Sequence, residues 1–167
     1  MSQDLPRPSQ LWKQLPPERK LQAAEAFWSD RNASVEHAEA IVAIAQRIKF
    51  RPKSVIALPV DKKARHLVAL SVVSELVAAR LLVAYHLTHQ RPLMAAFLDA
   101  LGIEHEDGLI KAEEMEAPPA DRLEQAAKKI ASDYPAPDVT LYLTTLMWQD
   151  PETWGGLEKL TPAEANP

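Results

Sequence analysis

The sequence predicts an all-α protein, a single compact multi-helical bundle of about seven or eight helices around a central apolar helix. Three observations indicate this fold. The chain of 167 residues contains 4 glycines, too few for the many tight turns of a β-protein. Several of its 14 prolines stand just before acidic residues, as they do at helix starts. Between these points, apolar residues recur with the period of an α-helix.

Six proline-containing stretches each predict the first turn of a helix. Proline suits the first helical position because no amide hydrogen bond is required there. An acid in the same turn complements the positive end of the helix dipole. The six stretches begin at Pro16, Pro59, Pro119, Pro137, Pro151 and Pro162. Because their spacing is irregular, no fixed-period repeat is predicted.

Apolar stripes in the first half of the chain predict two long helices and a central one. The first stripe comprises Leu21, Ala24, Phe27 and Trp28, and the second comprises Val35, Ala38, Ile41, Val42, Ala45 and Ile48. Residues 53–58 are flanked by prolines, which favours a short helix or turn over a strand. The run from about Leu67 to Gln90 is too apolar for a surface helix, so it is predicted to be the centre of the bundle.

The second half of the chain predicts three further long helices. Their apolar stripes run over residues 93–101, 123–134 and 139–147. Gly102 is expected to end the first of them in a left-handed conformation, with Ile103 folding back on Leu98. Residues 111–119 are acidic and end in two prolines, which predicts a surface linker. Residues 150–156 are expected to form a short helical turn.

These elements predict an N-terminal arm over residues 1–14, one α-helical domain over residues 15–160 and a frayed tail over residues 161–167. The absence of cysteine excludes disulfides and thiolate metal sites. The N-terminus lacks an apolar core of signal-peptide length, and Glu75 and Arg80 interrupt the most apolar run, which disfavours a membrane span. We therefore expect a cytoplasmic protein without a membrane partner.

A narrow polar stripe is predicted along the central helix. At 100° per residue, its members are Ser71, Glu75, His86 and His89. The stripe either lines the pocket of a small-ligand binder or enzyme, or is the thin solvent face of a core helix. A metal site is disfavoured because Glu75 lies about 16 Å from His86 along the helix. An antiparallel helix after Gln90 would also carry residues 104–107, with His105, about 15 Å away. We expect neither a metal nor a cofactor.

Charges are segregated along the sequence. Between Arg47 and Arg65, seven basic residues stand against Asp61, a net charge of +6, whereas the segment from Asp99 to Glu124 has a net charge of −7. The candidate anion-binding residues are Arg47, Lys49, Arg51, Lys53, Lys62, Lys63 and Arg65. They could hold a phosphate or a nucleic-acid backbone. With Phe50 as the one aromatic residue and no recognition motif, a solvated or internally paired face is favoured.

No glycine-rich phosphate loop, nucleophile elbow or dinucleotide fingerprint occurs in the sequence, so an enzyme is disfavoured. We expect a protein–protein interaction module whose partner is another protein or a second copy of the chain, possibilities that include a homodimer. Trp12, Trp148 and Trp154 are either contact residues, because tryptophan is enriched at binding hot spots, or core residues. Two alternatives stay open. They are a small-ligand binder or enzyme that uses the polar stripe, and nucleic-acid or phosphate binding through the basic segment.

Overall fold

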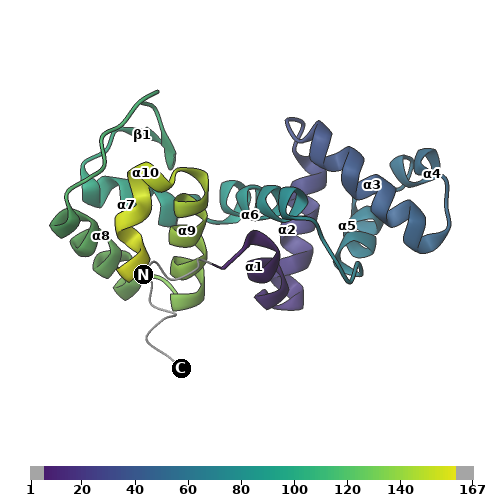
Figure 1. Cartoon of the computed structure of the whole chain (residues 1–167), viewed down its shortest axis with the longest axis horizontal. Coiled ribbons are helices and arrows are strands. Elements are labelled where there is room, and N and C mark those ends of the chain that lie inside the picture. The colour runs from purple at the N-terminus through teal and green to yellow at the C-terminus, as the bar shows by residue number, and fades with distance from the viewer. Residues whose placement is uncertain (1–5, 161–167) are drawn as a thin grey trace. The chain divides into compact units, whose positions relative to one another are not determined.

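The computed structural model describes residues 6–160 and confirms the all-α prediction (Figure 1). Over this part, the chain forms ten α-helices, one 3-10 helix and a small two-stranded hairpin. The described residues fall into two compact units, an N-terminal unit of residues 6–88 and a C-terminal unit of residues 89–160. The predicted domain boundaries stay predictions, and the tail over residues 161–167 lies outside the described residues.

The N-terminal unit contains six helices. They are α1 (Pro8–Gln14), α2 (Pro17–Ser29), α3 (Ser34–Ile48), α4 (Pro52–Ile56), α5 (Val60–Val68) and α6 (Glu75–His89), whose last residue opens the C-terminal unit. Helix α2 packs along α5, and α3 contacts both α4 and α5. Figure 1 shows α3, α4 and α5 gathered together. Leu11 and Trp12 of α1, which lie within the predicted arm, are buried.

An aromatic cluster forms part of the core of the N-terminal unit. Phe27 is fully buried, and its ring lies edge-on to that of Trp28 at 5.0 Å between centroids. The ring of His37 packs against both, at 4.7 and 5.0 Å, and its Nε2 lies 2.5 Å from the carbonyl oxygen of Phe27. The cluster therefore joins the C-terminal end of α2 to the first turn of α3.

The stripe predicted to be the buried face of α3 is partly wrong. Val35 and Val42 are exposed, whereas Ala40 and Ile44 are buried. The buried face of α3 is therefore rotated about the helix axis relative to the predicted one. A polar contact in the first turn explains this, because His37 contacts the carbonyl of Phe27 and so faces the core. A helix whose polar residues are fixed in this way buries a different set of apolar positions from those that its pattern alone favours.

The predicted central helix over Leu67–Gln90 is interrupted. Helix α5 ends at Val68, α6 begins at Glu75, and residues 69–74 between them are not helical. Ser74 caps α6, because its Oγ accepts a hydrogen bond from the backbone N–H of Val77 at 3.2 Å. The two β-branched valines just before Ser74 also have low helix propensity. The sequence thus contains a helix start within an apolar run.

The C-terminal unit contains four α-helices, the hairpin and a 3-10 helix. In chain order, they are α7 (Arg91–Leu101), β1 (His105–Glu106), β2 (Leu109–Ile110), α8 (Ala120–Asp133), α9 (Ala136–Gln149), α10 (Pro151–Trp154) and η1 (Gly155–Leu160). Helix α7 packs on α8, and η1 contacts both α8 and α9. The predicted ending of α7 is confirmed, with Gly102 at φ +72° and the N–H of Ile103 donating to the carbonyl of Leu98 at 3.0 Å.

Phe97 of α7 lies at the centre of an aromatic cluster in the C-terminal unit. Its ring centroid is 5.7 Å from that of Tyr142 and 5.9 Å from that of Trp154. Trp154 is buried, as Trp12 is in the N-terminal unit. Of the two roles that the sequence leaves open for tryptophan, the core role therefore applies to Trp12 and Trp154. Trp148 is exposed.

The proline rule predicted helix starts well. Helices α2 and α10 begin at Pro17 and Pro151, α5 and α8 begin directly after Pro59 and Pro119, and Pro137 lies in the first turn of α9. The sixth predicted start, at Pro162, lies outside the described residues. No helix within residues 6–160 is both long enough and apolar enough to cross a membrane.

Candidate functional site

The predicted polar stripe does not form one surface, and its geometry needs correction. Ser71 lies in the non-helical segment before α6. The carboxylate of Glu75 accepts hydrogen bonds from the backbone N–H and the hydroxyl of Ser9, at 2.9 and 3.2 Å. His86 is 3% exposed, with its ring 5.8 Å from that of Tyr85, whereas His89 is exposed. In the stripe, Glu75 therefore connects α6 to α1, His86 is a core residue and His89 is a surface residue.

The acidic loop after α7 is an ordered β-hairpin. His105 pairs with Ile110 and Glu106 with Leu109, and the two turn residues between the strands, Asp107 and Gly108, both have positive φ. Positive φ at both positions is typical of the two-residue turns that join antiparallel strands. Because strand residues alternate between faces, the Glu106–Leu109 pair points away from the face that carries the His105–Ile110 pair.

The hairpin is fixed to α7 by polar contacts at both ends. His105 Nδ1 accepts a hydrogen bond from the N–H of Gly108 at 3.0 Å, so Nε2 bears the proton that it shares with Asp99 at 2.6 Å. At the other end, Nη1 of Arg91 donates to the carbonyl of Asp107 at 3.1 Å. The hairpin therefore lies back along α7 to its first turn. The prediction that the acidic loop is carried away from the turn after Gln90 is wrong.

His105 has a structural role in this arrangement. Both of its ring nitrogens are engaged by groups of the same unit. A general base needs a free nitrogen within reach of a substrate proton. Within residues 6–160, no group of three or more histidine, aspartate and glutamate side chains is placed to hold a metal ion. The His105–Asp99 pair accordingly orients the hairpin.

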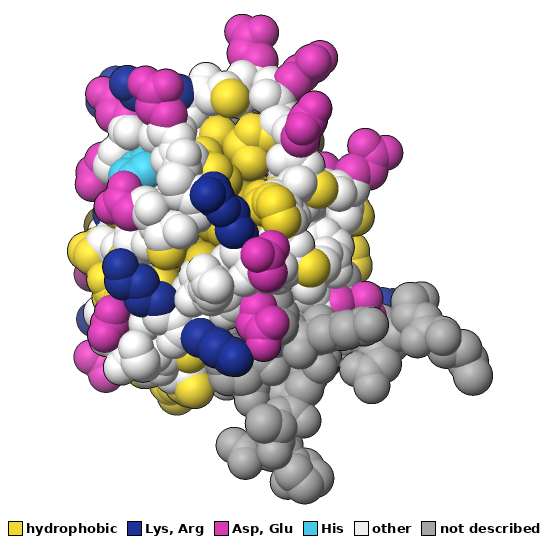
Figure 2. Space-filling view, turned by 90° about the vertical axis from the view of Figure 1, so that its left-hand side faces the viewer, with side chains coloured by type: hydrophobic (Ala, Val, Ile, Leu, Met, Phe, Trp, Pro, Cys, Tyr) yellow, Lys and Arg dark blue, Asp and Glu magenta, His cyan; other side chains and the backbone are white. Residues whose placement is uncertain are grey.

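Acidic side chains surround the outward face of the hairpin. Leu109 is 44% exposed on this face, and Glu104, Glu106 and Asp107 are exposed beside it. The following linker adds Glu113, Glu114 and Glu116, all exposed. Figure 2 looks onto the side of the C-terminal unit where acidic side chains line the upper margin. We call the outward face of residues 104–111 the acidic hairpin surface.

The basic segment forms an exposed surface on the N-terminal unit. We define the basic surface by six exposed cations: Arg47, Lys49, Arg51, Lys53, Lys62 and Arg65. They lie on the C-terminal end of α3, on α4 and on the first turns of α5. Among the residues that the structure describes, none of the six side chains forms an ion pair or a hydrogen bond. The internally paired interpretation therefore does not apply to them.

Lys63 differs from the other cations of the segment. Its side chain is half-buried, and Nζ lies 5.1 Å from the centroid of the Trp28 ring. This cation–π contact joins α5 to α2 and gives Lys63 a structural role. Of the seven predicted anion-binding residues, six are available for binding and one stabilises the fold.

Large apolar side chains are exposed between these cations. Phe50 is 50% exposed in the turn between α3 and α4, Ile56 is 57% exposed on α4, and Val60 is exposed at the start of α5. Isolated exposed apolar residues are ordinary, but several on one short segment indicate an interaction surface. The charge pattern of the sequence indicated the cations and gave no indication of Ile56 and Val60. The signal for Ile56 was an apolar residue in a five-residue helix between two prolines.

The N-terminal and C-terminal units carry net charges of opposite sign, as the basic and acidic segments of the sequence do. Residues 6–88 contain thirteen basic and seven acidic residues, a net charge of +6, whereas residues 89–160 contain six basic and fourteen acidic residues, a net charge of −8. The basic surface lies wholly in the first unit and the acidic hairpin surface wholly in the second. Each unit therefore presents a field of one dominant sign to an approaching molecule.

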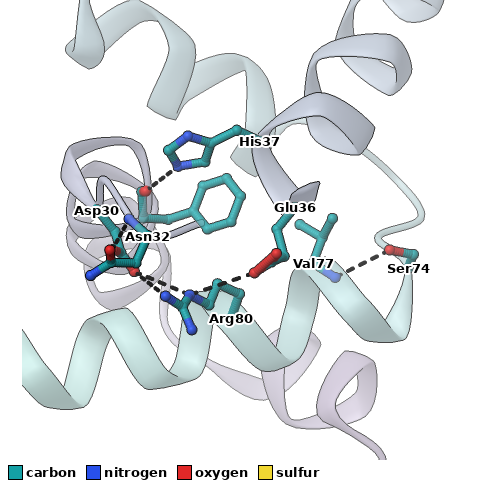
Figure 3. A network of polar contacts seen from close by, with 8 residues as sticks. Asp30, Asn32, Glu36, His37, Ser74, Val77 and Arg80 are labelled. Carbon is teal, nitrogen blue, oxygen red and sulfur yellow. Dashed lines mark hydrogen bonds and ion pairs between the residues drawn. The ribbon is translucent and has the colours of Figure 1, made fainter. Parts of the chain in front are cut away.

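An ion-pair network stabilises the framework of the N-terminal unit (Figure 3). Arg80 of α6 donates to Asp30 through Nε at 3.1 Å and also lies 3.6 Å from Glu36 of α3. Asp30 in turn accepts a hydrogen bond from the N–H of Asn32 at 2.9 Å. The carboxylates are mostly buried, as expected for charges that are paired with arginine. The network joins α6 to the α2–α3 turn and the start of α3.

Comparison of the chain with protein-family models, with curated proteins and with solved structures gave no significant match in any of the three.

Proposed function

We propose that the protein is an interaction module that binds an acidic segment of a partner protein at its basic surface. One observation carries this proposal: Phe50 and Ile56 are exposed among six cations that have no internal partner. Contact with apolar side chains supplies affinity when they leave water, and the surrounding cations steer and orient an acidic partner.

The apolar component favours protein over nucleic acid as the partner. Binding of a nucleic-acid backbone is served by lysine and arginine alone, with aromatic residues added where bases stack. Ile56 and Val60 offer neither a charge nor a stacking face. Protein interfaces, by contrast, typically surround an apolar centre with a polar rim, and arginine is enriched in them.

A pull-down from native lysate with matched variants tests the proposal. The test variant is Arg51→Glu/Lys53→Glu, on the basic surface. The control variant is Lys13→Glu/Arg31→Glu, which makes the same change of net charge at two exposed positions of the same unit outside that surface. We expect wild type and control to capture a protein in stoichiometric amount after nuclease treatment, and the test variant to lose it.

Three results would contradict the proposal. They are an empty pull-down with wild type, a captured protein that both variants retain equally, and a signal that nuclease removes. The last would support the competing function, nucleic-acid binding by the same cations, and the affinity would then fall steeply as salt rises. Circular dichroism of the three proteins checks that the substitutions leave the helices intact.

A further inference from the structure

The acidic hairpin surface and the basic surface have the same design with opposite charge. Leu109 projects from the hairpin among Glu104, Glu106 and Asp107, and Phe50 and Ile56 project from the basic surface among lysines and arginines. On both surfaces, the apolar side chains are about half exposed. Complementary potentials around matching apolar centres are what orient two protein surfaces toward each other.

The hairpin is rigid enough to act as a ligand. Its inner side is held by the His105–Asp99 contact at 2.6 Å and by the bond from Arg91 to the carbonyl of Asp107 at 3.1 Å. Gly108 lies so close to α7 that an added Cβ would come 2.8 Å from Cβ of Met94. Because the hairpin is ordered before binding, docking it costs little conformational entropy.

We propose that the occupant of the basic surface is the acidic hairpin surface of a second copy of this chain. This inference rests on the proposed function and names the partner. The contact is heterologous, since different patches of the two copies meet, so association continues head to tail or closes into a ring. The units have opposite net charges, +6 and −8, so attraction between unlike units of two copies also favours the encounter.

Light scattering and sedimentation over a range of protein concentrations test this proposal. We expect the mean mass of the wild-type chain to rise with concentration at low salt. The association constant should fall about tenfold or more when the salt concentration is raised to several times the physiological value, because surface charge pairs are screened. A mass that stays monomeric at every concentration in low salt, or an association that salt leaves unchanged, would overturn the proposal.

Two variants that each lose one surface make the test specific. Arg51→Glu/Lys53→Glu reverses two charges of the basic surface, and Glu106→Lys/Leu109→Ser reverses one charge and removes the apolar side chain of the acidic hairpin surface. Each should be monomeric alone, whereas a mixture of the two should form a heterodimer, since each still carries the surface that the other lacks. Lys13→Glu/Arg31→Glu and Glu152→Lys are the charge controls, and both should still associate, because each reduces the magnitude of the net charge of one unit and leaves the two surfaces unchanged.

The outcomes separate this inference from the proposed function. If the mixed variants stay monomeric, or if the controls lose association as fully as the test variants, the second copy is not the occupant. Should the wild-type chain be monomeric while Arg51→Glu/Lys53→Glu still abolishes capture of a different protein, the proposed function stands and this inference fails. Hydrogen exchange over residues 104–111 verifies that the hairpin variant keeps its fold.

Discussion

Of the four glycines, Gly108 is the one at which the structure predicts the largest effect of adding a single methyl group. Its φ of +89° is disfavoured for any residue with a Cβ, at a cost of about 1–2 kcal/mol. The Cβ of alanine would also come 2.8 Å from Cβ of Met94 and 3.2 Å from the carbonyl oxygen of Arg91. Relieving that overlap requires the hairpin to shift, at a further cost of about 1–3 kcal/mol. Gly108→Ala should therefore destabilise the C-terminal unit by about 2–5 kcal/mol.

Two other glycines provide controls that separate these causes. Gly102 also has positive φ, +72°, but its nearest neighbour would lie 3.8 Å from the new Cβ, so Gly102→Ala should have only the conformational cost of about 1–2 kcal/mol. Gly155 has φ −55° and no atom within 4 Å of the new Cβ. Gly155→Ala should therefore be neutral or stabilise the protein by up to about 1 kcal/mol, since it reduces the freedom of the unfolded chain.

Hydrogen exchange measured on peptides from residues 89–110 reports the stability of this region directly, and urea unfolding followed by circular dichroism supplies the free energies. The expected order of stability is Gly155→Ala, then Gly102→Ala, then Gly108→Ala. If Gly108→Ala costs no more than Gly102→Ala, then the close packing of the turn on α7 contributes nothing and the reasoning is refuted.

Three further predictions concern stability. Arg80→Leu leaves the mostly buried carboxylate of Asp30 without its arginine. It should lower the free energy of unfolding in urea by about 1–3 kcal/mol, at the low end because the pair is partly solvated. An unchanged urea midpoint would contradict this. Ser74→Ala removes the cap of α6 and should cost about 1 kcal/mol, whereas Ser74→Asn should restore most of it. Burial raises the pKa of Tyr142 well above its ordinary value near 10. Because the unfolded state then ionises first, the free energy of unfolding should fall as pH rises above about 10, and Tyr142→Phe should lessen that fall.

The local rules of helix formation predicted most of the fold. Proline and acid pairs located helix starts because they act within one turn, independently of the rest of the chain. The apolar stripes of α7, α8 and α9 also predicted their buried faces, as Phe97, Ile130 and Leu143 show. The prediction was partly wrong for α3, where contacts of His37 and Glu36 with other elements decide which face is buried. Such contacts between elements leave no periodic signal in the sequence.

The sequence predicted the charges of the two candidate surfaces but not the positions of the apolar side chains among those charges. The basic and acidic segments are evident in the sequence because each is nearly continuous. The pairing of Glu106 with Leu109, which puts an apolar side chain at the centre of the acids, follows from the register of a two-residue turn. An Asp-Gly pair favours such a turn, but four residues of strand are too few for an alternating pattern to indicate which face is outward.

The break between α5 and α6 decides how the polar stripe should be interpreted. Assigning Ser71 and Glu75 to one stripe assumed an uninterrupted helix, in which residues four apart share a face. That assumption is wrong, because the hydroxyl of Ser74 accepts a hydrogen bond from the N–H of Val77. Ser74 is therefore the N-cap, the residue just before α6 begins. Glu75 is then a first-turn acid whose carboxylate is engaged by Ser9, a role that stabilises the helix start and attaches α1. Once Glu75 and Ser71 are explained in this way, the stripe retains only two histidines, one buried and one exposed. The exposed charges of the basic surface and the acidic hairpin surface are therefore the stronger basis for a function.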